Sequence, residues 1–438
     1  MNYSLIMIIA IAIIAAIALG YCTNINTGLY AIAFSYLIGC YIMGKKPAEI
    51  TAMWPIKIFF VILAVSLFYN FAIINGTLEK MAMHILYRCR KLENFLIFII
   101  FLIAVLVAGM GAGYFAVMAF LCPLTLMLTE KTSMSKLEGV IAVSFGALAG
   151  ANFMTSMSGL IFRGLMEAAG YGEQVFSYGT SIFVMTMIVP VLLLIGLMML
   201  GRKRRSDKSD AIEIEKPEAF SKKQKINLWL IFILIVTVLS VPMFNLIMPN
   251  NSYISILNRN MDVSFIAIIL SIIALCLKLA DEKAVIARVP WNTLIMICGV
   301  GMLIEIAVAA GTIDLLASWI GTNIPTFFVP VVLTIIAGIM SFFSSTLGVV
   351  APALFPVVPV LAAATGISPM VLFTCIIMGA QSTGGISPFS SGGSLALGSC
   401  ATEEDRETLF DQLMFKATPT VFFVVVVVGF IYGIVWKG

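Results

Sequence analysis

Two distant segments of the chain interrupt apolar runs with glycine, serine and threonine. The first reads AGMGAGYFAVMAFLCPL and ends at Leu124, and the second reads SFFSSTLGVVAPALFP and ends at Pro356. In each segment a proline follows ten positions after Gly113 or Thr346. Non-helical backbone at membrane depth is tolerated only where it lines a cavity or is buried in protein. Free amides and hydroxyls in such a cavity would bind an anion, and carbonyl oxygens would bind a hard cation.

Each segment is followed by a second break rich in small residues. These breaks read GALAGANFMTSMSGL from Gly146 and GAQSTGGISPFSSGGSL from Gly379. Paired interruptions in corresponding halves of a membrane protein are the best sequence pointer to a transport site. Small residues also let membrane helices pack closely, and we favour packing for Gly146, Ala147, Gly150 and Gly379. The dense hydroxyl clusters at 344–346 and 387–391 favour a binding site.

The composition is that of an all-α polytopic membrane protein. The chain is 61% hydrophobic and 11% charged, with a mean hydropathy of +1.08, whereas soluble domains carry about 25% charged residues. Many runs approach the roughly 20 apolar residues of a membrane span. The eight cysteines form no CxxC pair, so zinc sites and disulfide frameworks are not expected.

The hydrophobic pattern predicts one order of elements twice: three spans, an amphipathic interfacial helix, a re-entrant hairpin, a broken helix and a span. In the first repeat, 1–200, these lie at 1–75, 76–94, 95–129 and 137–200. A polar linker occupies 201–225. In the second repeat, 226–438, they lie at 226–310, 312–322, 325–364 and 368–436. Five spans per half is an odd number, so the two repeats must be inverted.

Charge sets the expected orientation. The linker RKRRSDKSDAIEIEKPEAFSKKQK is rich in Lys and Arg, which places it in the cytoplasm. Counting spans from the linker leaves few basic residues outside, and only the Lys45–Lys46 pair conflicts. Both termini are then expected outside the cytoplasm. The first hairpin enters from the cytoplasm and the second from outside, and the two meet near the midplane.

This plan, the two hairpins and the Ser-Ser-Thr at 344–346 resemble the ion-transporter superfamily, which includes divalent-anion/sodium symporters for dicarboxylates and citrate. Within it, GYCTNINTGLYAIAFSYLIGCYIMG and MWPIKIFFVILAVSLFYNFAIINGTLEKMAMHILYR resemble the malonate-carrier type of dicarboxylate permease. The resemblance implies elevator-type transport, with a scaffold that dimerises and a moving transport domain. It implies import of a C3 or C4 dicarboxylate, such as malonate or succinate, by cation symport in a bacterial inner membrane.

The chain departs from that family pattern at both hairpin tips. Family members carry Ser-Asn-Thr at each tip, whereas Ser345 replaces the asparagine of the second tip here. The first tip has Gly111, Ala112 and Gly113 and offers no side-chain oxygen. Any role of the first tip must therefore use backbone groups or the adjacent Tyr114 hydroxyl.

The substrate is expected between the two tips, where half-helix N-termini and hydroxyls supply donors. Its contacts are predicted from the match of Gly150, Thr155 and Ser156 to Gly385, Ser390 and Ser391. The predicted substrate residues are Ser344, Ser345, Thr346, Ser390, Ser391, Gly392, Asn152, Thr155, Ser156, Gly113 and Tyr114. The predicted sodium residues are Gly111, Ala112, Gly113, Gly150, Ala151, Asn152, Ser344, Thr346, Gly385 and Ser387. Protons are the alternative coupling ion, and no cofactor is expected.

The remaining ionisable residues have simpler explanations. Arg163 and Glu167 are spaced i,i+4 and are expected to pair. Glu305 lies within a span and is either a proton or cation relay, or a residue that faces a polar crevice or a subunit contact. His84 is expected at the lipid headgroups.

Several other functions compete with this one. Another ion on the same fold, such as citrate, sulfate, arsenite or sodium in exchange for protons, stays open. The chain has a single histidine and therefore no HExxH motif, which disfavours a metalloprotease. No GxxxxGK[ST] occurs, which disfavours ATP-driven transport. A channel is disfavoured because inverted repeats with broken helices suit alternating access. The expected partners are a dicarboxylate, a coupling cation, lipid and a second copy of the chain, with no nucleic acid.

Overall fold

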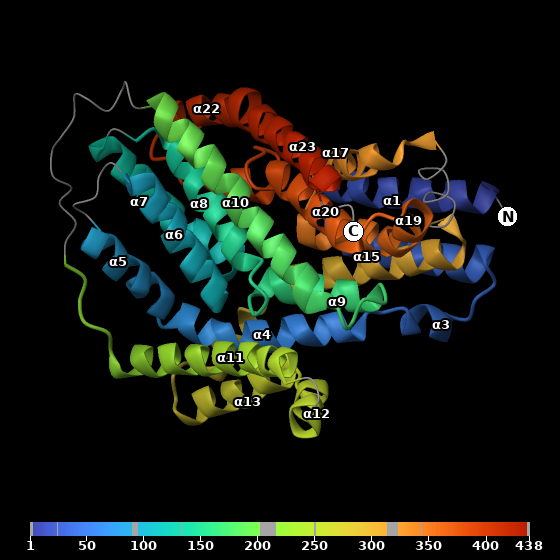
Figure 1. Ribbon diagram of the computed structural model, residues 1–438, viewed down its shortest axis with the longest axis horizontal. Helices are drawn as coiled ribbons and strands as arrows, with labels where there is room; N and C mark the ends of the chain where they lie inside the picture. Colours follow the sequence, from blue (N-terminus) through green and yellow to red (C-terminus); the bar gives the residue numbers. More distant parts are fainter. Residues whose placement is uncertain are drawn as a thin grey trace.

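The computed structural model describes residues 3–435 apart from 24, 90–94, 133, 202–215, 249–250, 313–322 and 343. The described residues form helices joined by turns and irregular segments (Figure 1). Six helical segments are long and apolar enough to span a membrane: Ile56–Ile74, Leu96–Glu130, Val175–Met199, Trp291–Ala309, Thr346–Thr365 and Glu403–Val435. Five shorter apolar helices accompany them. The expectation of an all-helical membrane protein is confirmed.

The first half has helices within each of the predicted ranges, and the short α3 between two of them. The first three spans and the interfacial helix correspond to α1 (Tyr3–Thr23), α2 (Thr27–Tyr36) with η1 (Leu37–Ile42), α3 (Pro47–Ala52), α4 (Ile56–Ile74) and α5 (Thr77–Cys89). The later elements are α6 (Leu96–Val107), η3 (Ala108–Ala112), α7 (Gly113–Lys131), α8 (Lys136–Ala151), α9 (Met157–Ala168) and α10 (Val175–Gly201).

The described helices of the second half follow the same order, with α12 and α22 in addition, and α14 precedes α15 as α3 precedes α4. Its first helices are α11 (Lys222–Ile247), α12 (Ser252–Asn260), α13 (Val263–Cys276), α14 (Glu282–Ala287) and α15 (Trp291–Ala309). Then come η5 (Thr326–Phe328), α17 (Val329–Phe342), η6 (Thr346–Val350), α18 (Ala351–Leu354), η7 (Phe355–Val357), α19 (Val358–Thr365), α20 (Pro369–Gly384), α21 (Ser391–Gly398), α22 (Glu403–Gln412), η8 (Leu413–Ala417) and α23 (Thr418–Val435). The interfacial helix predicted at 312–322 lies, apart from residue 312, outside the described residues.

The chain reverses direction between α6 and α7. The end of α6 lies against the end of α8, because a Cβ on Gly150 would come within 2.2 Å of the Val105 carbonyl oxygen. The later part of α7 lies against the start of α8, because a Cβ on Gly139 would come within 2.8 Å of Thr125. The helices α6 and α7 therefore run in opposite directions along α8, as a hairpin does.

The same packing register occurs in both halves. A Cβ on Gly379 would come within 2.2 Å of the Thr334 carbonyl oxygen, and a Cβ on Gly150 would come equally close to the Val105 carbonyl oxygen. Both pairs are 45 residues apart (150 − 105 and 379 − 334). The pair in α17 and α20 thus corresponds to the pair in α6 and α8 with an offset of 229 residues. Close approach also confirms that Gly150 and Gly379 serve packing.

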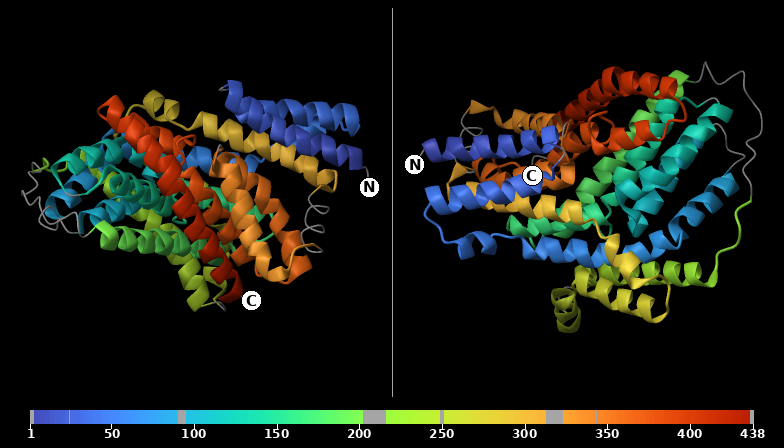
Figure 2. Two further views of the ribbon diagram at one scale, coloured as in Figure 1. Left: turned by 90° about the horizontal axis from the view of Figure 1, so that it is seen from above. Right: turned by 180° about the vertical axis from the view of Figure 1, so that it is seen from behind.

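The outer helices pack across the two halves in a matching way. The helix α2 packs on α15, and α13 packs on α4 (Figure 2). The α2–α15 contact is made by glycines: a Cβ on Gly28 would come within 2.3 Å of the Ile295 carbonyl oxygen, and one on Gly299 within 2.2 Å of the Gly28 carbonyl oxygen. Each half therefore supplies helices to both of these contacts.

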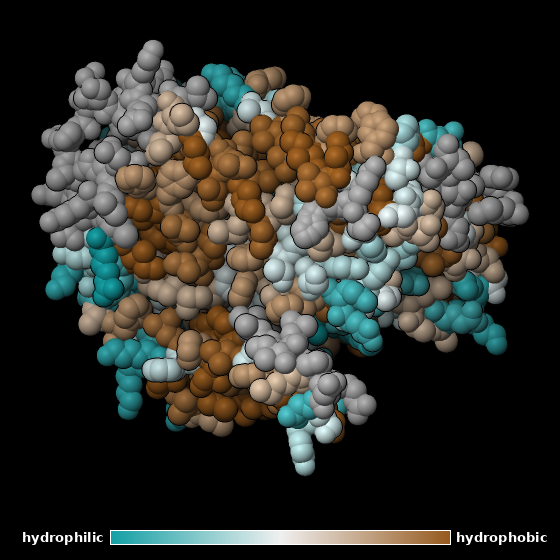
Figure 3. Space-filling view, in the orientation of Figure 1, coloured by the Kyte–Doolittle hydropathy of each residue, from teal (hydrophilic) through white to brown (hydrophobic). Residues whose placement is uncertain are grey.

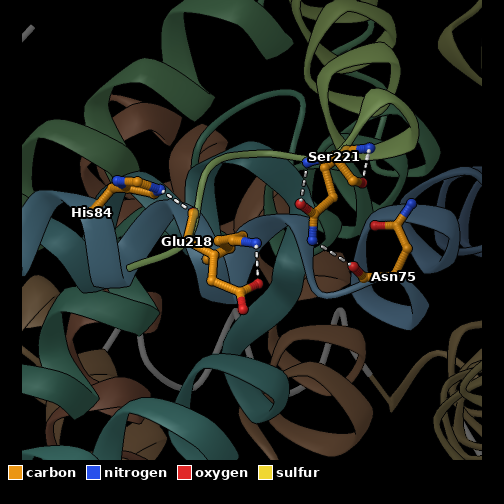
Figure 4. A network of polar contacts seen from close by, with 6 residues as sticks. Asn75, His84, Glu218 and Ser221 are labelled. Atoms are coloured by element: carbon orange, nitrogen blue, oxygen red, sulfur yellow. Dashed lines mark hydrogen bonds and ion pairs between the residues drawn. The ribbon is translucent and has the colours of Figure 1, made fainter. Parts of the chain in front are cut away.

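The end of the polar linker is fixed on α5 (Figure 4). The His84 ring nitrogen Nε2 lies 2.9 Å from the Glu218 carbonyl oxygen, and Lys80 Nζ lies 3.5 Å from the Glu218 carboxylate. Gln224 Nε2 donates to the Asn75 carbonyl oxygen at 3.0 Å. Because of these bonds, α5 and the start of α11 lie on the same side of the protein.

The outer surface carries large apolar side chains. Figure 3 shows broad hydrophobic areas over the region of α10 and α23 and over that of α11. Exposed side chains there include Leu192 and Met199 on α10, Phe423 on α23, and Trp229 on α11. An apolar surface of this kind suits contact with lipid acyl chains.

Candidate functional site

The first hairpin tip is built from glycines that no other residue can replace without strain. Gly111 has φ +97° and Gly113 has φ +71°, in the region that side chains disfavour. A Cβ on Gly111 would lie 2.1 Å from the Tyr69 ring. The helix α7 begins at Gly113, so its first amides are free of helical partners. The tip thus presents backbone donors and no side-chain oxygen of its own.

Tyr114 connects the first tip to the second half. Its hydroxyl donates to the Gly385 carbonyl oxygen at 3.1 Å, and Ser144 Oγ donates to the same oxygen at 2.7 Å. A carbonyl oxygen has two lone pairs, so both are engaged. Gly385 is therefore tied to protein hydroxyls at the place where sodium was predicted to bind.

The second tip carries the hydroxyls. Ser344 Oγ donates to the Met340 carbonyl oxygen at 2.5 Å, and Thr346 Oγ1 lies 2.9 Å from Ser341 Oγ. Ser345 caps the helical turn η6 by accepting from the Gly348 amide at 3.1 Å. An accepting hydroxyl keeps its own proton, which leaves the Ser345 O–H to donate elsewhere.

The two helix breaks, 152–156 and 385–390, are tied to the hairpins by serines. Ser156 Oγ donates to the Ala108 carbonyl oxygen at 2.7 Å, and Ser387 Oγ donates to the Phe342 carbonyl oxygen at 2.9 Å. Ser156 and Ser390 are the residues that precede α9 and α21, with similar backbone angles (φ −89°, ψ 166° and φ −86°, ψ 162°).

The structure corrects the predicted match between the breaks. Gly150 corresponds to Gly379 by its packing, and not to Gly385. Ser156 corresponds to Ser390 by its position before the next helix, and not to Ser391. The helix α20 extends further than α8 before its break, so a single offset cannot align the helices and the breaks together.

A small cavity of about 40 Å³ lies between the two tips. It brings together predicted residues of both halves, namely Tyr114, Ser344, Ser345, Thr346 and Gly392. It has room for roughly three water molecules. Among the other predicted substrate residues, Thr155 is buried, and its hydroxyl has no partner among the described residues. Asn152 and Ser156 are also buried and are bonded to protein groups.

A larger cavity of about 800 Å³ adjoins the first tip. We call it the vestibule. It is lined by Ala112, Gly113, Tyr114 and Ser390 among the predicted residues, and Arg288 is the one charged side chain among its described lining residues. Tyr114 and Phe115 line both the vestibule and the cavity between the tips. These two side chains therefore separate the two spaces.

A third cavity, of about 670 Å³, lies at the opposite end of α4. Its charged lining residues are Glu49, Lys57, Glu167 and Glu305. Glu305 thus faces a polar crevice, one of its two predicted environments. Arg163 Nε lies 2.8 Å from Glu167 Oε1, which confirms the expected pair.

The structure distributes the predicted sodium residues over the two tips and the ends of α8 and α20. Gly111, Ala112 and Gly113 are at the first tip, and Gly150, Ala151 and Asn152 are at the end of α8. Ser344, Thr346, Gly385 and Ser387 are at the second tip and the second break. Sodium binding at either place stays a prediction.

Three residues beside these cavities escaped the sequence analysis. Gln381 and Ser158 line the cavity between the tips, and Arg288 lines the vestibule. Gln381 lies within the GAQSTGG break, but the match of Gly150 to Gly385 does not align it with Asn152. The offset of 229 residues that aligns the two comes from the packing of Gly150 and Gly379. Arg288 stands in a loop before a span, where basic residues usually only set orientation.

Comparison with known proteins identifies the family and the fold. A family model described as the N-terminus of the dicarboxylate carrier protein MatC matches residues 1–151 and 230–385. The crystal structure of the YdaH transporter of Alcanivorax borkumensis is similar, with 15% sequence identity and a TM-score of 0.58. The match covers 90% of this chain and 88% of that chain. At this identity the likeness establishes the fold alone. No curated protein sequence matches the chain.

Proposed function

This chain belongs to the MatC dicarboxylate carrier family, and on that premise we propose that it is a secondary transporter importing a C3 or C4 dicarboxylate by cation symport. The observation that carries the proposal is the hydroxyl-lined cavity between the two tips, one from each half. Donors without fixed charge suit a substrate that must be released again, because a buried salt bridge with a lysine or arginine would hold it. In the proposed orientation the vestibule faces the cytoplasm, so its Arg288 guanidinium would attract the anion as it leaves the cavity.

We further propose that the two halves are inverted repeats and that transport is of the elevator type. The shared 45-residue register and the exchange of α2, α4, α13 and α15 contacts support a two-fold relation between the halves. The scaffold would be α1–α4 with α11–α15 and would form the dimer contact. The transport unit would be α6–α10 with α17–α23. Both termini would then lie outside the cytoplasm of a bacterial cell.

Uptake into proteoliposomes tests the function. Labelled malonate or succinate should accumulate when a sodium gradient is imposed, and citrate and sulfate should compete weakly. Sodium and pH gradients are applied separately. Uptake that ignores sodium but collapses with a protonophore would exclude sodium as the coupling ion. Sulfate or citrate transport without malonate or succinate transport would contradict the dicarboxylate assignment.

Thr346→Ala tests the site. A hydrogen bond to a charged group contributes roughly 1.5–3 kcal/mol, so the variant should bind dicarboxylates about ten- to hundredfold more weakly. Thr365→Ala is the matched control, because its hydroxyl bonds the Leu361 carbonyl oxygen away from the cavity. Normal substrate affinity with reduced expression of Thr346→Ala would instead indicate a packing role.

A further inference from the structure

Asn152 and Gln381 form a reciprocal pair of hydrogen bonds between the two halves. Asn152 Nδ2 donates to Gln381 Oε1 at 2.9 Å, and Gln381 Nε2 donates to Asn152 Oδ1 at 2.9 Å. Both side chains are buried, with 1% and 5% of their surface exposed. Their separation, 381 − 152 = 229, equals the offset between the corresponding glycines Gly150 and Gly379. The two residues thus occupy equivalent positions and meet where the halves meet.

Thr186 on α10 fixes the orientation of this pair. Its hydroxyl has one proton, and it donates that proton to the Ile182 carbonyl oxygen at 2.7 Å. Thr186 Oγ1 can therefore only accept from Asn152, at 3.0 Å, so the atom of Asn152 that faces it must be Nδ2. Once Asn152 is fixed, the Gln381 amide can face it in one way only, with Nε2 toward Asn152 Oδ1.

Counting donors shows which residue of the pair has one to spare. Each primary amide has two N–H groups. Asn152 uses one on Gln381 and the other on Thr186. Gln381 uses one on Asn152, and its second N–H has no partner among the described residues. Asn152, a predicted substrate residue, is therefore fully occupied, whereas Gln381 retains a free donor.

Among the described residues of the second half, none bonds Gln381 as Thr186 bonds Asn152. The helix α23 packs on α20 as α10 packs on α8. It brings Val421 and Val425 to a small apolar space that Gln381 and Thr186 also line. Valine side chains cannot accept a hydrogen bond. The Ser382 hydroxyl also lines this space, but it donates to the Gly379 carbonyl oxygen, and no bond joins it to Gln381 in the described structure. Gln381 also lines the cavity between the tips, beside Ser345 and Thr346.

We infer that the free Nε2–H of Gln381 donates to a carboxylate of the transported dicarboxylate, with Asn152 and Thr186 as positioning residues. The inference rests on the proposed function. A buried N–H without a partner is costly, and a ligand oxygen in the cavity between the tips would satisfy it. The amide adds a fixed donor to the rotatable hydroxyls of Ser345 and Thr346, and so defines where one carboxylate sits.

Kinetics of the full-length protein in proteoliposomes test this assignment. Gln381→Leu should raise the KM for malonate and succinate about ten- to hundredfold and leave the maximal rate within about twofold. Gln412→Leu is the matched control, because Gln412 lies on α22 away from the cavity. Thr186→Val should raise KM by a smaller factor, about threefold, because Gln381 is still present but less firmly oriented. Thr186→Ser keeps the acceptor and should restore the wild-type KM.

The outcomes that contradict the proposed function differ from those that contradict only the role of Gln381. If the wild-type protein transports no dicarboxylate, the proposed function is wrong and the inference falls with it. If the wild type transports dicarboxylates but Gln381→Leu keeps the wild-type KM, only the inference is overturned. The same holds if Gln381→Leu changes the cation concentration for half-maximal rate and not the substrate KM. If Gln381→Leu does not fold, an equal KM in Thr186→Val and Thr186→Ser overturns the positioning relay and the donor role with it.

Discussion

Gly150→Val and Gly379→Val are each expected to prevent folding, so that little folded protein is present in the membrane. At each position a Cβ would lie 2.2 Å from a backbone carbonyl oxygen of the neighbouring helix. Backbone cannot move aside as a flexible side chain can, so we expect each variant to lose about 3 kcal/mol or more. The two variants should be equally affected, because the two glycines occupy equivalent positions. Size-exclusion profiles of detergent-solubilised protein measure the loss.

Gly196→Val is the control for these variants. Gly196 lies on α10, and a Cβ there would meet nothing within 4 Å, so this variant should elute as the wild type does. If Gly150→Val elutes normally while Gly379→Val aggregates, the two positions are not equivalent. That result would contradict the two-fold relation between the halves.

A disulfide between the cysteines of a Gly348→Cys, Met296→Cys variant is expected to abolish transport. Gly348 is at the second tip, in the proposed transport unit, and Met296 is on α15, in the proposed scaffold. A Cβ on Gly348 would lie 2.9 Å from Met296 Cγ, one bond from Met296 Cβ. The two Cβ atoms therefore fall in reach of a disulfide, which needs about 3.5–4.5 Å. Movement of the transport unit past α15 would be blocked by this bond.

The experiment uses Gly348→Cys with Met296→Cys in a protein whose eight native cysteines are replaced. Oxidation should lower uptake at least tenfold, and a reductant should restore it. Each single-cysteine variant under the same oxidant controls for side reactions. Full uptake by protein whose crosslink is verified by mass spectrometry would show that this contact does not move, which contradicts the elevator mechanism.

The hairpin tips and helix breaks could be predicted because their signals are local. Glycine at 111 and 113 permits positive φ, and the hydroxyls at 344–346 interrupt an apolar run wherever the rest of the chain lies. What those hydroxyls bond could not be predicted, because their partners come from other elements. Ser387, for example, bonds the Phe342 carbonyl oxygen of α17, and only the packed structure reveals this.

Arg288 and Gln381 show why the rest of the site was missed. From the sequence alone, Arg288 is one of the basic loop residues that set the orientation of the chain in the membrane. A sequence does not show that its loop borders a cavity. Gln381 reads as part of a small-residue break. Its free donor depends on Thr186, an α10 residue that orients Asn152. It also depends on valines of α23, which offer Gln381 no hydrogen-bond acceptor. Such a difference between equivalent positions becomes visible only when all these helices are placed.

The Asn152–Gln381 pair bears on how such a chain could arise. Where two identical subunits meet on a two-fold axis, a residue there faces its own copy and must be its own complement. A primary amide meets that condition, because it carries a donor and an acceptor side by side. A homodimer of single repeats could thus have been joined here by one asparagine or glutamine from each subunit. Fusion of the two copies would then have allowed one of the two amides, as its surroundings changed, to take on a ligand.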